Sequence, residues 1–222
     1  FFHRWLAFFT NHFTVSAAKR PVTPFWGAFQ RDALRPHVLG RFGDLLVAVE
    51  QHPAMLLYLD NVRSIGPNSR AARGKRGLNE NLAREILELH TLGVDGGYGQ
   101  DDILALAKII TGWTTPRQAE QLARGTFRFN ARAHEPGAKR LLGESVGEGL
   151  AAGEAAMQRL AVHPSTARHV CRKLAIHFVA DDPPARLVDA LTQAWMASAG
   201  DLSQVARALI AHLFKEGARI LT

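Results

Sequence analysis

Apolar residues recur every three to four positions along most of the chain, which is the spacing of an amphipathic helix. Residues 2–14 are rich in aromatic side chains and predict a buried first helix. Further predicted helices cover residues 25–35, 43–51, 53–60, 79–92, 101–112, 148–162, 164–179, 183–198 and 201–214. Because the connections are short, we expect a mostly all-α fold, a multi-helix bundle with antiparallel or orthogonal neighbours.

Proline and glycine mark several of the helix boundaries. Pro53 and Pro164 each stand at a first helical position, where the missing N–H costs nothing. Gly93 follows the helix over 79–92 and predicts a left-handed cap at its end.

One segment departs from the helical pattern. Phe127-Arg128-Phe129 alternates with a period of two, and Glu135-Pro136-Gly137 is a turn signal, so we expect one small β-hairpin near 126–143. Gly143–Gly147 matches the nucleophile elbow of some hydrolases. That motif needs a strand before the serine and a parallel sheet behind it, and the pattern here instead favours a glycine-rich turn.

The chain of 222 residues is long enough for one domain with its own core. We expect a single helical domain over 1–222, with a division into 1–115 and 145–222 around the hairpin region as the alternative. Because the chain starts at Phe1 and not at Met, we also expect it to be a fragment of a longer protein.

Composition changes this picture in one respect, the charge. Hydrophobic residues at 47% and charged residues at 21% are ordinary for a globular protein and exclude a disordered or collagen-like chain. No apolar run approaches the roughly 18 residues of a membrane span, so no transmembrane segment is expected. The net charge of +7 favours anionic partners in general.

The basic residues cluster most densely in the segment 70–76, among glycine and serine. This composition is typical of a solvated surface loop. The alternative is a patch that binds an anionic polymer, with Arg73 and Arg76 as candidate binding residues. No aromatic residues interleave with the cluster, so the stacking part of a single-strand nucleic-acid site is missing.

The helix over 79–92 carries the clearest candidate chemistry. A helical wheel places His90 and Asn79 inside a wide apolar arc, which consists of Leu82, Ala83, Ile86, Leu87 and Leu89. Glu80, Arg84 and Glu88 follow the opposite side at the spacing of an ion-pair stripe. His90 is therefore a polar ring directed at the core.

A buried imidazole needs partners for both nitrogens. One hypothesis makes His90 a satisfied core histidine, and the other makes it a catalytic base or metal ligand with Glu85 as its partner. Glu85 and His90 lie about 140° apart at 3.6 residues per turn, which is poor for one ion. A metal site would have to recruit His12, His134 or another distant residue, so the sequence identifies no metal and no cofactor.

A second histidine stripe occurs later in the chain. His169, Lys173 and His177 lie one turn apart, and Lys173 between the two rings repels cations. We expect a flank or a solvated face there and no metal site. Cys171 falls on the apolar face of the same helix, where a small buried thiol is usual.

Several long blocks resemble a known family. They are residues 52–61, the block from Arg76 to Val94 that contains Asn79-Glu80-Asn81 and His90-Thr91-Leu92-Gly93, residues 106–113 ending in Thr111-Gly112-Trp113, residues 134–143, and residues 163–179. Together they are similar to the bacterial family catalogued as domain of unknown function eighteen hundred. The resemblance covers about residues 5–210 and implies a helical domain of larger bacterial proteins, often exported to the periplasm or beyond and often encoded beside another exported family.

The block from Arg76 to Val94, which we call the signature block, and the residues near it concentrate polar side chains that a plain scaffold does not need. The candidate binding residues are Asn79, Asn81, Asp60, Asn61, His12 and His134, which would line a polar pocket if they converged. We expect a structural or interaction module with a buried polar network around the Asn79–Gly93 helix. The alternatives are a hydrolase-like or metal-dependent enzyme that uses His90 and Glu85, and a module that binds an anionic polymer.

Overall fold

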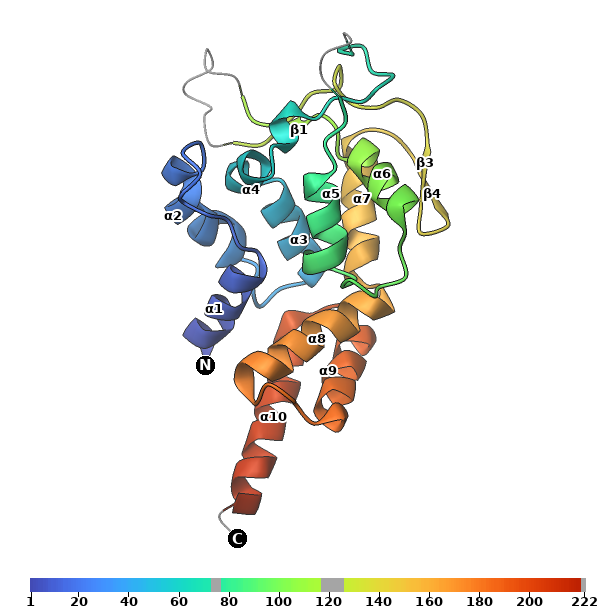
Figure 1. Ribbon diagram of the computed structural model, residues 1–222. Helices are drawn as coiled ribbons and strands as arrows, with labels where there is room; N and C mark the ends of the chain where they lie inside the picture. The colour runs from blue at the N-terminus through green and yellow to red at the C-terminus, as the bar shows by residue number, and fades with distance from the viewer. Residues whose placement is uncertain (73–76, 117–125, 221–222) are drawn as a thin grey trace.

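The computed structural model describes residues 1–72, 77–116 and 126–220, with the backbone alone for residues 216–220. It is mostly helical and confirms the predicted fold class (Figure 1). The upper body contains α1 (Phe2–His12), α2 (Trp26–Phe29), α3 (Phe42–Glu50), α4 (Pro53–Tyr58), α5 (Asn81–Glu85), α6 (Gln100–Ile109) and α7 (Leu150–Ala161). The lower group consists of α8 (Pro164–Phe178), α9 (Ala185–Ala197) and α10 (Leu202–Ile220).

Short 3-10 and π turns lie next to several of the helices. The 3-10 turns are η1 (Thr23–Phe25) and η3 (Asn61–Arg63), and the π turns are η2 (Gln30–Leu34), which extends α2, and η4 (Ile86–His90), which extends α5. The predicted helix 79–92 is therefore an α turn followed by a π turn.

The π turn changes which side chains face the core. Leu89 was expected in the apolar arc, and it is 44% exposed, so that expectation is wrong. A π turn bonds i to i+5 and advances by a smaller angle per residue, so the 100° wheel fails beyond Glu85. His90 nevertheless stays buried, as predicted.

Two small antiparallel sheets lie where one hairpin was expected. β1 (Trp113–Thr114) pairs with β2 (Arg128–Phe129), and β3 (Lys139–Leu141) pairs with β4 (Glu144–Val146). The alternating segment 127–129 thus pairs with a strand before it. The second hairpin turns at Leu142 and Gly143, both with positive φ, as a two-residue turn of the primed type requires. Of the glycine-rich turn predicted over Gly143–Gly147, Gly143 lies in this turn, whereas Glu144–Val146 is strand β4.

One connected core runs through both groups of helices. Trp5, Trp113 and Trp195 are fully buried in it. α3 packs on α7 inside the body, and α8 and α10 both pack on α9. Phe42 at the start of α3 contacts Trp195 of α9, so the body and the lower group share apolar contacts. No helix of the described chain is long and apolar enough to cross a membrane.

Candidate functional site

The centre of the candidate site is a buried hydrogen bond between the last residues of α3 and η4. His90 at the end of η4 donates from Nδ1 to Oε1 of Glu50 at the end of α3, at 2.8 Å. The Glu50 side chain is 0% exposed and the His90 side chain 4%. Among the described residues, the second oxygen of Glu50 has no hydrogen-bond partner. The carboxylate beside His90 is therefore that of Glu50, and not that of Glu85.

His12 extends this contact toward the lower helices. Its Nε2 donates to the carbonyl oxygen of His90 at 3.1 Å, and its Nδ1 accepts from Nζ of Lys173 at 2.9 Å. Burial lowers the pKa of His12 well below its usual value, and the charge of Lys173 lowers it further. Burial also lowers the pKa of Lys173. We call Glu50, His90, His12 and Lys173 the polar network.

The predicted histidine stripe forms the flank of this network. His169 donates from Nε2 to the carbonyl oxygen of Leu89 at 3.2 Å, and His177 donates from Nε2 to that of Arg4 at 3.2 Å. Burial, followed by the charge of Lys173, lowers the pKa of His169. The stripe on α8 thus contacts α1 and the end of η4, which agrees with the expected flank.

Gly93 lets the chain leave η4 close beside His169. Its φ of +84° confirms the predicted left-handed conformation, although the helical segment ends at His90 with Thr91 as its C-cap. A Cβ at Gly93 would lie 2.6 Å from Nδ1 of His169. We expect Gly93→Ala to lower the free energy of unfolding by about 1–2 kcal/mol from the left-handed backbone alone. Urea unfolding measures this, with Gly77→Ala as the control because a Cβ there meets nothing within 4 Å. An unchanged midpoint for Gly93→Ala would contradict the prediction.

The imidazoles near the polar network do not form a metal centre. The ring centroids of His12 and His90 lie 6.2 Å apart, and those of His12 and His169 lie 6.4 Å apart. Both nitrogens of His12 already have partners, one of which is a lysine. In the part of the chain that the structure describes, no three His, Cys, Asp or Glu side chains are placed to hold a metal ion. Cys171 is buried, and burial raises its pKa to about 12.

The candidate residues Asn79, Asn81, Asp60 and Asn61 have hydrogen-bond partners outside the polar network. Asn79 accepts from the N–H of Asn81 at 2.9 Å, and its amide donates to the carbonyl oxygens of Leu59 and Asp60. Asp60 pairs with Lys19 at 2.8 Å. Asn61 donates to the carbonyl oxygens of Ile110 and Trp113. These amides fix the loops around η3, because they bond main-chain carbonyls of neighbouring segments.

His134 belongs to a second polar cluster near the sheets. It donates from Nδ1 to the carbonyl oxygen of Thr111 at 2.9 Å and accepts at Nε2 from the N–H of Gly149 at 2.9 Å. The neighbouring Glu135 accepts from the side chain and the main chain of Asn68. His12 and His134 therefore serve different clusters, and the expected single pocket of polar residues is divided.

A surface depression of about 770 Å³ lies over the start of α5. Its lining includes Arg63, Asn79, Asn81 and Arg84. Arg84 forms ion pairs with Glu80 and Glu88 at 3.3 and 3.4 Å, which confirms the predicted stripe. Arg63 lies 4.0 Å from Asp60, so both arginines of the depression have acidic neighbours.

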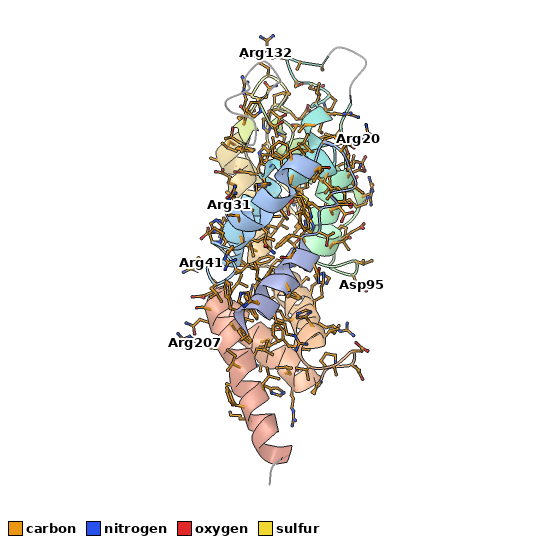
Figure 2. All side chains as sticks on the ribbon, turned by 90° about the vertical axis from the view of Figure 1, so that its left-hand side faces the viewer. Arg20, Arg31, Arg41, Asp95, Arg132 and Arg207 are labelled. Atoms are coloured by element: carbon orange, nitrogen blue, oxygen red, sulfur yellow. The ribbon has the colours of Figure 1, made fainter. Side chains whose placement is uncertain are left out.

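The basic charge is spread over the surface. Figure 2 shows exposed arginines at widely separated places, and its labels include Arg20, Arg31, Arg41, Arg132 and Arg207. The candidate residues Arg73 and Arg76 lie outside the described residues. The depression and these arginines do not form one continuous basic groove.

The fold and the site define a mostly helical domain with a buried histidine and carboxylate network. The chain belongs to the family described as Protein of unknown function (DUF1800), whose model matches residues 1–218. No curated protein and no solved structure matches the chain.

Proposed function

We propose that this domain acts as a structural and interaction module, in which the polar network holds α1, α3, η4 and α8 in one arrangement. Burial of the central pair is the observation that supports this role. His90 is 3% exposed and Glu50 is 0% exposed, so a substrate has no route to the ring in this arrangement. The described depression over α5 is lined by other residues.

The structural role has a physical basis in the hydrogen bonds themselves. Buried polar groups that lack a partner are costly, and a network in which most members are bonded favours one packing over its alternatives. Here the bonded members come from helices that are distant in the sequence, since His12 and Lys173 are 161 positions apart. Loss of one member would leave another buried group without its partner.

A second candidate function is catalysis, in which His90 acts as the base. The contact of 2.8 Å with Glu50 favours it, because a carboxylate on one imidazole nitrogen fixes the orientation of the ring that a general base needs. In this proposal Glu85, on the same helix, takes part with His90. The enzyme hypothesis requires a motion that exposes the ring.

Replacing the carboxylate of Glu50 distinguishes the structural role of the polar network from catalysis by His90. We expect Glu50→Ala to lower the free energy of unfolding by about 2–3 kcal/mol, because a buried N–H of His90 loses its acceptor and a cavity is left. Glu85→Ala is the matched control on a half-buried site and should change it by less than about 0.5 kcal/mol. Urea unfolding at pH 7.5 measures both. A Glu50→Ala variant as stable as the parent would contradict the structural role and favour catalysis.

A further inference from the structure

We propose that the contact between α1 and α8 is an acid-sensitive joint, which is closed while His12 is neutral and loosens when this ring takes up a proton. We call this contact the α1–α8 joint. The inference rests on the proposed structural role of the polar network and adds to it a regulation by pH.

Titratable groups supply the polar contacts that cross the joint. At one end, Nζ of Lys173 donates to Nδ1 of His12. At the other end, Arg4 donates from Nη2 to the carbonyl oxygen of His177 at 2.6 Å, and His177 donates back to that of Arg4. His169 adds a bond from α8 to the end of η4. Among these contacts, the one between Lys173 and His12 depends on protonation, because it needs an unprotonated ring nitrogen as its acceptor.

His12 can serve the joint only in its neutral form. Its Nε2 must carry a proton because it faces a carbonyl oxygen, so its Nδ1 is the acceptor for Lys173. A proton on Nδ1 would convert this acceptor into a donor that faces an ammonium group. The hydrogen bond between α1 and α8 would be replaced by the repulsion of two like charges in a buried place.

The charges around His12 give its added proton little compensation. Lys173 and His169 face it from α8, and His90 faces it from η4. The carboxylate of Glu50 on α3 is already bonded to His90. Burial, followed by the charge of Lys173, keeps the pKa of His12 below its unfolded value near 6.5.

Because the pKa of His12 is lowered in the folded state, acid weakens the α1–α8 joint. The folded state with a closed joint prefers neutral His12. The stability that neutral His12 gives to the joint is therefore complete above pH 6.5. It is lost as the pH falls from 6.5 toward the lowered pKa. Each unit by which the pKa is lowered corresponds to roughly a tenfold change in the opening equilibrium.

The joint can loosen without loss of the rest of the core. Its apolar part includes ring contacts of Phe178 with Phe1 and Trp5, at centroid distances of 5.3 and 6.0 Å. α8 stays attached through its packing on α9, and α3 and α7 pack on each other inside the body. The opening is therefore expected in α1 and α8.

Amide hydrogen exchange of the full chain at pH 7.5 and pH 5.5, corrected for the intrinsic pH dependence of exchange, tests the joint. We expect protection in peptides of residues 2–12 and 164–178 to fall roughly tenfold more at pH 5.5 than in peptides of α3 and α7. His12→Gln should remove this extra loss, because an amide can donate and accept at the same two places without titrating. His3→Gln is the control on an exposed histidine of the same helix.

A second variant keeps the proposal testable if His12→Gln does not fold. Lys173→Met removes the charge that opposes the proton on His12, so the pKa of His12 should rise toward 6.5 and the extra loss should be smaller and complete at a higher pH. Equal losses in all four helices, or an unchanged pH profile in both variants, would overturn the joint. Such a result would leave the neutral-pH stability of the network, which Glu50→Ala tests, unaffected.

Discussion

His90→Ala is expected to lower the free energy of unfolding by about 3–5 kcal/mol, the range for leaving a buried charged group without its partner. The carboxylate of Glu50, with no exposed surface, loses its single bonded partner among the residues that the structure describes. The ring also fills space against Phe13, with centroids 5.1 Å apart, so a cavity adds to the cost. Urea unfolding at pH 7.5 measures the change.

The control for this substitution is His3→Ala, because His3 is exposed on α1. It should change the free energy of unfolding by less than about 0.5 kcal/mol. The double variant Glu50→Ala with His90→Ala should be more stable than the sum of the two single changes predicts, by about 0.5–3 kcal/mol. A folded His90→Ala protein within 1 kcal/mol of the parent would show that the pair does not stabilise the fold.

The helical part of the fold could be predicted from the sequence because its signals are local. Pro53 and Pro164 mark helix starts that the structure confirms, and Gly93 marks the end of a helical segment. The burial of His90 was also correct, because its neighbours in sequence are apolar. Periodicity and capping need only the few residues on either side.

The partners of His90 could not be predicted, because they come from distant parts of the chain. Glu50 is 40 positions away, and Lys173 contacts His12 from 161 positions away. One local signal for Glu50 existed, since it follows Leu46 by one turn on an apolar helix face. The π turn that exposes Leu89 has no comparable signal in spacing, because the 3.6 period assumes an α-helix throughout.

The pairing of the short strands also required tertiary information. Phe129 lies opposite Trp113, and the segment between them is longer than a hairpin loop. The turn signal at Glu135-Pro136-Gly137 precedes the second hairpin instead of joining two strands. Alternation predicted a strand at Phe127–Phe129 but not its partner.

Acid should destabilise the whole domain through a histidine outside the α1–α8 joint. His52 precedes α4, and its Nδ1 accepts from the N–H of Ala54 at 3.1 Å, so a neutral ring is the N-terminal cap of this helix. Burial lowers the pKa of His52 to about 4, with the neighbouring charge of Asp32 opposing the shift and that of Arg31 adding to it. Protonation would remove the acceptor and place a positive charge at the positive end of the helix.

The folded pKa of His52 lies below the unfolded value near 6.5. The stability that the neutral His52 cap gives to the fold is therefore complete above pH 6.5 and is lost as the pH falls toward 4. At 1.36 kcal/mol per pKa unit, and allowing for partial solvent screening, the loss is about 2–3 kcal/mol. Urea unfolding at pH 7.5 and pH 4 should show it. In His52→Asn, a favoured cap that does not titrate, the drop should be smaller by that amount, with stability at pH 7.5 within about 1 kcal/mol of the parent. Equal drops in both proteins would mean that the His52 cap does not set the acid limit of this fold.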